Sequence, residues 1–170
     1  ELGRAKPGLR VAPSAAAATA AVLGGFTFFS GLGSAASAAV ALDRPRPRHL
    51  FLAVALAIPG CFLAFQGAAP ALLRAGGGVR LAVLVASLAP AAFLMGLPFP
   101  LAFARLLRRD PGAAPLALAV NGLFSVAGAT LASLSALWLG FRATAIAAAA
   151  CYGIAGALFP GARRGAGVPR

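Results

Sequence analysis

Residues 81–104 read LAVLVASLAPAAFLMGLPFPLAFA, a stretch that carries no charged side chain. A helix needs about 20 mostly apolar residues to cross the hydrocarbon core of a bilayer, and this stretch is long enough. Lipid offers no hydrogen-bonding partner to the backbone. A helix bonds its own N–H and C=O groups, whereas an open strand leaves them without partners. The stretch therefore predicts a transmembrane helix, which we place over residues 80–107.

Four further stretches without charge repeat this pattern along the chain. They cover residues 11–42, 50–73, 111–141 and 143–162. The helices that we expect within them lie near 15–42, 50–69, 115–139 and 143–160. We expect the first to be tilted, or broken near Gly24-Gly25 or Gly31-Leu32-Gly33. The alternation of a membrane barrel is missing, so the sequence predicts an all-α, polytopic transmembrane bundle of about five helices.

The ends of the chain differ from this apolar body. Residues 14–162 form the predicted five-helix transmembrane domain, and residues 163–170 form a basic C-terminal tail. Residues 1–13 are polar, and we interpret them as the remnant of an upstream helix. The chain begins with Glu1 rather than Met and shows no signal peptide. We therefore expect a fragment or a processed product, joined to an upstream catalytic or membrane domain.

Composition indicates which surroundings the chain faces. Hydrophobic residues make up 61% of it and charged residues only 11%, whereas a soluble domain carries about 25% charged residues. The net charge of +12 comes from short basic clusters between apolar runs, as expected of loops beside an anionic membrane face. We therefore expect the lipid bilayer as a partner and exclude nucleic acid.

Basic residues in the loops also predict the orientation. One side of the membrane receives three arginines from internal loops: Arg74, Arg80 and Arg142. The other side receives six: Arg44, Arg46, Arg48, Arg105, Arg108 and Arg109. Cytoplasmic loops carry the excess of Lys and Arg. The bias predicts that the 43–49 loop, the 105–112 loop and the C-terminus lie in the cytoplasm.

Residues that catalysis or metal binding require are scarce. The chain has three acidic residues, one histidine and two cysteines, and none of the acidic residues lies inside an apolar run. Cys61 and Cys151 form no CxxC or Cys/His pattern, and we interpret them as small buried hydrophobes. We therefore predict no catalytic, cofactor-binding or metal site in this segment.

Two prolines interrupt the third predicted helix. Pro98 and Pro100 remove two backbone donors and force a kink. Such a break is tolerated in a membrane where protein or a water-filled cavity satisfies the freed backbone groups. The break is therefore either a hinge facing a substrate, as in transporters, or a fixed kink that shapes the bundle.

The fourth predicted helix carries a stripe of polar and small residues. Its members are spaced by four, three, four and three positions, so they share one face: Asn121, Ser125, Gly128, Ala132 and Ser135. Gly128 and Ala132 predict a helix-packing seam, whereas Asn121 and Ser125 are also candidates to line a cavity. The first helix has a similar small face, which consists of Ser30, Gly33, Ser34, Ser37 and Ala38. Gly31, Gly33 and Ser34 are its candidates for helix packing. We expect the two faces to pack on each other.

The third and fourth predicted helices carry a family resemblance. Met95-Gly96-Leu97-Pro98-Phe99-Pro100-Leu101, followed by Pro115 to Gly122 with Asn121, then Ser125, Gly128 and Tyr152, is similar to one bacterial membrane region. That region follows the catalytic domain in integral-membrane spermidine synthase-like proteins. The likeness extends over about residues 14–160. The chain departs from it at Leu116 and Leu118, where the family tends to have Trp.

The resemblance implies a parent protein with a Rossmann-like aminopropyltransferase domain that uses decarboxylated S-adenosylmethionine and a polyamine acceptor. No catalytic residue carries over, because none of that domain is present. The chain would then be a non-catalytic domain of the bacterial cytoplasmic membrane that anchors the enzyme and guides a small, polyamine-like substrate. The alternatives are a fragment of a major-facilitator-like transporter of a small solute and a purely structural membrane module.

The polar stripe generates a first prediction. If Asn121 lines a cavity, Asn121→Leu will leave membrane insertion intact, because leucine is better tolerated by lipid, and will impair substrate-linked activity of the intact protein. Insertion is measured as protein recovered in washed membranes, and activity is measured on the same membranes. Unchanged activity would contradict the cavity interpretation of Asn121.

Overall fold

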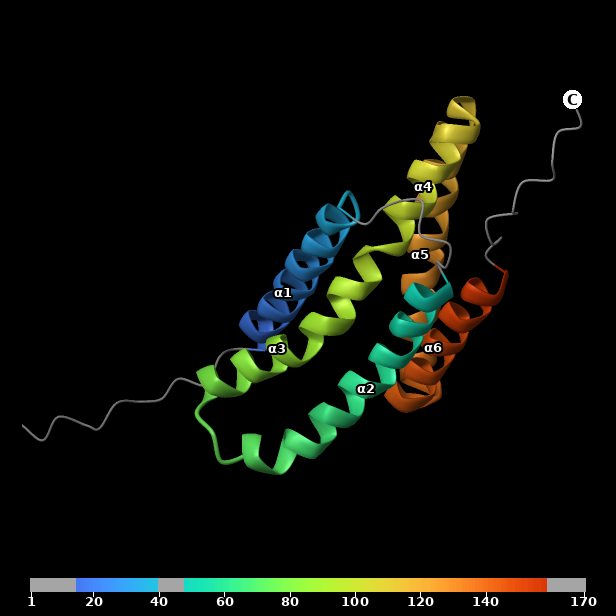
Figure 1. Cartoon of the computed structure of the whole chain (residues 1–170). Helices are drawn as coiled ribbons and strands as arrows, with labels where there is room; N and C mark the ends of the chain where they lie inside the picture. The colour runs from blue at the N-terminus through green and yellow to red at the C-terminus, as the bar shows by residue number, and fades with distance from the viewer. Residues whose placement is uncertain (1–14, 40–47, 159–170) are drawn as a thin grey trace, which may run out of the picture.

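The computed structural model describes residues 15–39 and 48–158, and these residues fold into helices with no strand among them (Figure 1). The elements are α1 (Ala15–Ala36), α2 (Arg48–Leu72), α3 (Gly77–Gly96), α4 (Pro98–Arg109), the short 3-10 helix η1 (Pro111–Ala113), α5 (Ala114–Trp138) and α6 (Gly140–Leu158). The polar segment 1–13, most of the 43–49 loop and the basic tail 163–170 lie outside the described residues. The all-α prediction is confirmed.

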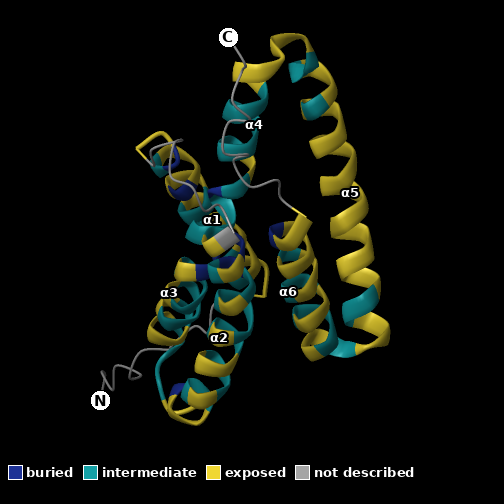
Figure 2. Cartoon of the chain, turned by 45° about the vertical axis from the view of Figure 1, so that its right-hand side comes forward, coloured by how far each residue is buried: buried dark blue, intermediate teal, exposed yellow. Residues whose placement is uncertain are grey.

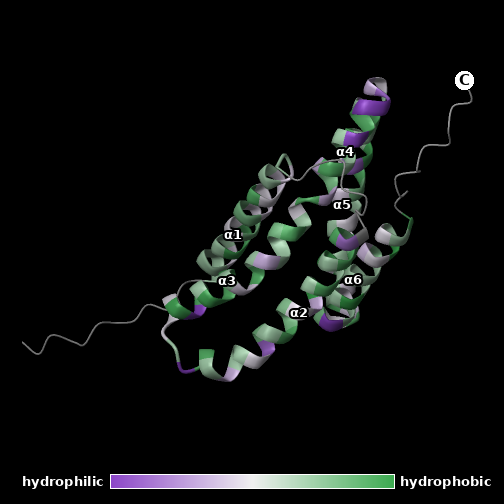
Figure 3. Ribbon diagram, in the orientation of Figure 1, coloured by the Kyte–Doolittle hydropathy of each residue, from purple (hydrophilic) through white to green (hydrophobic). Residues whose placement is uncertain are grey.

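Five helical stretches of the described chain are long and apolar enough to cross a membrane. Three of them lie within the single helices α1, α2 and α6. Pro111–Trp138 joins η1 to α5, and Gly77–Arg109 joins α3 to α4. Figure 3 shows apolar colours along all five and polar colours near the ends, most clearly at the end of α4. The chain is therefore a multi-pass membrane protein, as the charge-free stretches predicted.

The break in the helices is not in the first span. α1 runs without interruption past Gly24, Gly25 and Gly31 to Ala36, and a turn follows at residues 37–39. The structure therefore corrects the expected alternative of a broken first helix. A glycine pair lowers helix propensity but keeps its N–H groups, so packing overrides it. The break lies at Leu97, where prolines remove donors.

The helices pack in a row rather than around one centre. α1 lies on α3, α3 on α2, α2 on α6, and α6 on α5 (Figures 1 and 2). Only a few side chains in the middle are fully enclosed, such as Val54 of α2 and Ala92 of α3. α5 is exposed along nearly its whole length (Figure 2). In lipid such a surface needs no polar cover, because acyl chains are as apolar as leucine.

Close approach of two backbones holds α1 against α3. A Cβ atom at Gly33 would overlap the carbonyl oxygen of Phe93, and one at Gly96 would overlap that of Ser30. Small residues permit this approach and increase van der Waals contact, which drives helix association in a bilayer. The packing role predicted for Gly33 is thus realised, but with α3 as the partner.

A single arginine joins the end of α2 to the start of α3. The guanidinium of Arg80 donates to the carbonyl oxygens of Leu72, Leu73 and Ala75 at 3.1, 3.2 and 3.3 Å. These carbonyls lie at the helix end, where no further N–H follows to bond them. Arg80 therefore caps α2 and sets the return of the chain.

The turn between α5 and α6 is as tight as the sequence predicts. Gly140 adopts a φ of 83° directly after α5, a conformation that glycine adopts without steric cost. One turn further in, the hydroxyls of Ser135 and Thr144 lie 2.6 Å apart and join the two helices. The predicted antiparallel pairing of these helices is confirmed.

The glycine contact between α1 and α3 generates the second prediction. Gly33→Ala will lower the free energy of unfolding by roughly 1–3 kcal/mol, because the added methyl group forces the two backbones apart. Thermal unfolding of the purified protein in detergent measures the change. Gly24→Ala on the same helix is the matched control, since a Cβ there meets nothing within 4 Å. Equal unfolding temperatures for the two variants would refute the contact.

Candidate functional site

The site begins at the break between α3 and α4. Pro98 and Pro100 have no N–H, so the carbonyls of Leu94 and Gly96 lose the partners that a continuous helix would supply. The Leu97 N–H donates to the Leu94 oxygen at 3.3 Å instead. Gly96 is the last residue of α3 and Pro98 is the first of α4. The two prolines therefore interrupt the regular helical bonding at membrane depth.

A cavity of about 500 Å³ opens beside this break, and we name it the polar cavity. Four elements besides α3 form it: α1, α4, α5 and α6. Its polar wall consists of Thr27, Ser30, Ser34, Asn121, Ser125 and Tyr152. Its remaining wall consists of Phe26, Gly31, Met95, Gly96, Phe99 and Pro100. None of these described lining residues is charged. This is the size and mixed lining of a small-molecule site.

Three hydroxyls of the polar cavity, those of Thr27, Ser30 and Ser125, donate to their own helices. Thr27 donates to the Leu23 oxygen at 2.8 Å, and Ser125 donates to the Asn121 oxygen at 2.7 Å. A hydroxyl has one hydrogen and two lone pairs, so these oxygens can still accept hydrogen bonds. They therefore offer acceptors to a bound molecule.

Asn121 and Tyr152 supply the donors. Among the hydrogen bonds of the described residues, none involves the side-chain amide of Asn121 or the hydroxyl of Tyr152. Both side chains line the polar cavity. An amide without a partner is costly in an apolar environment, and such groups inside a membrane mark ligand sites or water-filled cavities. The polar cavity thus presents unused donors opposite available acceptors.

The structure brings together part of the candidate set from the sequence. Pro100, Asn121 and Ser125 line the polar cavity with Gly31 and Ser34 of α1. Pro98 starts α4 without lining the polar cavity. Whether any of these residues serves a ligand stays a prediction.

The direct contact expected between the α1 and α5 faces is wrong. The small face of α1 packs on α3, and the polar cavity lies between α1 and α5. On α5, Gly128 and Ala132 are exposed, and a Cβ at Gly128 would meet nothing within 4 Å. The predicted seam therefore has no partner helix in the described chain. The backbone approach at Gly33 and Gly96 brings α3 to the α1 face instead.

Several lining residues were not marked as site candidates by the sequence. Thr27 and Phe26 fall within an unremarkable stretch of α1, and Phe99 and Met95 are ordinary apolar residues of the third span. Tyr152 alone gave a signal, because a phenol at mid-helix requires a hydrogen-bonding partner. Only the packing of four spans shows that these residues share a space.

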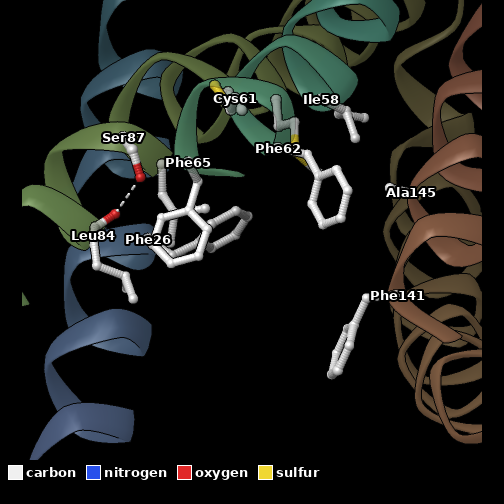
Figure 4. A pocket seen from close by; sticks show the side chains of 12 residues that line it. Phe26, Ile58, Cys61, Phe62, Phe65, Leu84, Ser87, Phe141 and Ala145 are labelled. Atoms are coloured by element: carbon white, nitrogen blue, oxygen red, sulfur yellow. Dashed lines mark hydrogen bonds between the residues drawn. The ribbon is translucent and has the colours of Figure 1, made fainter. Parts of the chain in front are cut away.

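A second cavity, which we name the apolar cavity, has a volume of about 590 Å³ between α1, α2, α3 and α6. Its aromatic wall consists of Phe26, Phe62, Phe65 and Phe141. Figure 4 shows almost only carbon around it, and the hydroxyl of Ser87 donates to the Leu84 oxygen at 2.8 Å. The apolar cavity therefore suits a hydrocarbon group and offers little to a polar one.

Near the α5–α6 turn, one polar contact crosses from α6 to α2. Arg142 donates to the Gln66 side-chain oxygen at 2.9 Å. The Gln66 amide nitrogen is buried and lacks a partner within the described residues. Gln66 thus bonds to a neighbouring helix as a membrane amide should. No group of three His, Cys, Asp or Glu in the described chain is placed to hold a metal ion.

Comparison with family models, with curated proteins and with solved structures finds no match for the chain. The likeness to the spermidine synthase-like membrane region therefore stands on the sequence motifs around Pro98 and Asn121. Function is argued below from the chemistry of the cavity wall.

The geometry of α5 generates the third prediction. In a variant lacking Cys61 and Cys151, a cysteine at position 125 (Ser125→Cys) will react with a water-soluble methanethiosulfonate at least about tenfold faster than Ser133→Cys, because only the thiolate reacts and it forms only where water reaches. Ser133 is an exposed α5 residue that lines neither cavity. Labelling rates in reconstituted bilayers are measured by mass spectrometry. Equal rates would show that the polar cavity is closed to water.

Proposed function

We propose that this chain is a membrane-embedded, non-catalytic ligand-binding domain whose polar cavity binds a small, uncharged, hydrogen-bonding solute. One observation carries the proposal: the Asn121 amide and the Tyr152 hydroxyl have no hydrogen-bonding partner among the described residues, and they line the same cavity as Gly96 at the helix break. Discontinuous helices supply backbone groups to substrates in transporters. A solute hydroxyl or amide would satisfy both the donors and the acceptors of this wall.

The charge of the wall argues for an uncharged solute. Among the described residues that line the polar cavity there is no carboxylate. Transfer of an ammonium group from water without a paired charge is strongly unfavourable. A polyamine carries several ammonium groups, so the polyamine-guiding role implied by the resemblance is the competing form of the proposal.

The wider setting follows the same resemblance. We propose that the domain resides in the bacterial cytoplasmic membrane and anchors an aminopropyltransferase-like domain of the same protein. We further propose that the C-terminus lies in the cytoplasm; the three arginines near the end of α4, Arg105, Arg108 and Arg109, support this orientation. A transporter fragment without an enzyme is the alternative that the helix break supports. A purely structural module would have no use for unpaired donors in a cavity.

Protection of the introduced cysteine tests the bound chemistry and is the fourth prediction. 1,2-Propanediol will slow the modification of Ser125→Cys by occupying the polar cavity, whereas spermidine at the same concentration will not. Adding Asn121→Leu will weaken the protection by about tenfold, which corresponds to the loss of about 1.4 kcal/mol of hydrogen bonding. The measurement is the diol concentration that halves the labelling rate in bilayers.

Two other outcomes are decisive. Protection by spermidine but not by the diol would replace the proposal with the polyamine-guiding role. Protection by neither molecule would reject solute binding and leave the structural module. Ser133→Cys serves as the control, because a diol that slows labelling there acts on the bilayer rather than on the site.

A further inference from the structure

The polar cavity and the apolar cavity share two wall residues. Phe26 of α1 and Met95 of α3 line both of them. The two spaces are therefore neighbours that meet at one aromatic ring and one flexible thioether. Methionine is unbranched and adapts its shape readily, so this shared wall is easily rearranged.

Their combined length suits a long, extended molecule better than a small one. Along α3 and α4 the lining residues run from Leu84 at the apolar end to Pro100 at the polar end. At 1.5 Å per residue this is about 24 Å. α6 runs alongside with Phe141 and Ala145 on the apolar cavity and Tyr152 on the polar cavity.

The lining side chains change from polar to apolar once along this length. Donors and acceptors are confined to the polar cavity, where Asn121, Ser125 and Tyr152 lie. The apolar cavity is bounded by rings and aliphatic chains, and its one hydroxyl, on Ser87, is bonded within its own helix. A fully polar solute would gain nothing from the apolar half, and a hydrocarbon would leave the donors of the polar half unsatisfied.

We propose that the two cavities together form one site for an uncharged amphiphile. Its hydrogen-bonding head lies at Asn121 and Tyr152, and its single hydrocarbon tail lies between α2, α3 and α6. The inference rests on the proposed function, since it uses the same head-binding wall, and it adds the substrate class. None of the described lining residues of either cavity is charged, which favours a head such as a glycerol or an alcohol over a phosphate or an ammonium group.

The test uses a monoacylglycerol that carries a photoreactive diazirine in its acyl chain, added to the intact protein in nanodiscs. Mass spectrometry of peptides locates the cross-links. We expect them on α2 between Ile58 and Phe65 and at the start of α6. Ala145→Phe fills the apolar cavity and will reduce these cross-links at least fivefold. Ala150→Phe is the matched control on α6, because Ala150 is exposed and lines neither cavity.

The outcomes separate this inference from the proposed function. Cross-links that Ala145→Phe leaves unchanged, or that spread evenly over the exposed faces, overturn the amphiphile site even if 1,2-propanediol still protects Ser125→Cys. Loss of diol protection and of site-specific cross-links together overturns both. If Ala145→Phe fails to fold, Ile58→Trp on the opposite wall blocks the same space. A phospholipid probe that labels the site as strongly would refute the uncharged head.

Discussion

Every backbone N–H and C=O in the hydrocarbon core needs a partner within the protein, because lipid provides none. This constraint makes each span of the chain a helix. Prolines inside the spans lack an N–H and so disturb this bonding. Pro59 and Pro70 lie inside α2 and Pro90 inside α3, and both helices continue past them. At Pro98 and Pro100, by contrast, α3 ends and α4 begins. Leu97 donates there to Leu94, and the polar cavity lies beside this break.

Packing of the bundle depends on small residues rather than on a large apolar core. Van der Waals contact is the main gain when helices associate in lipid, and it grows when backbones touch. Gly33 and Gly96 provide that contact between α1 and α3. α2 attaches to α6 with the Arg142–Gln66 bond, and α5 attaches to α6 with the Ser135–Thr144 bond. The row that results leaves space between α1 and α5, which a closed bundle would have filled.

Asn121 is a candidate binding residue because its side chain borders that space. On a helix packed against a neighbour, its amide would bond across the interface and serve assembly. No helix of the described chain packs against it there, and Tyr152 and Ser125 line the same cavity. The apolar cavity next to it continues the space through the bundle, past Phe26 and Met95. The polar cavity and the apolar cavity thus adjoin, and none of their described lining residues is charged. This arrangement is the basis for proposing an amphiphile rather than a small solute.

The sequence by itself determined the membrane fold, the five spans and the kinked third span. These follow from the length of charge-free runs and from missing proline donors, which depend only on neighbours along the chain. It also predicted Pro100, Asn121 and Ser125 as candidate residues of a hinge or a cavity wall. Only the tertiary structure decided that α3, not α5, covers the small face of α1, and that Thr27, Phe99 and Tyr152 join the cavity. The partner of a small-residue face depends on which backbones can approach each other in space, and in lipid many helix pairings have similar free energies.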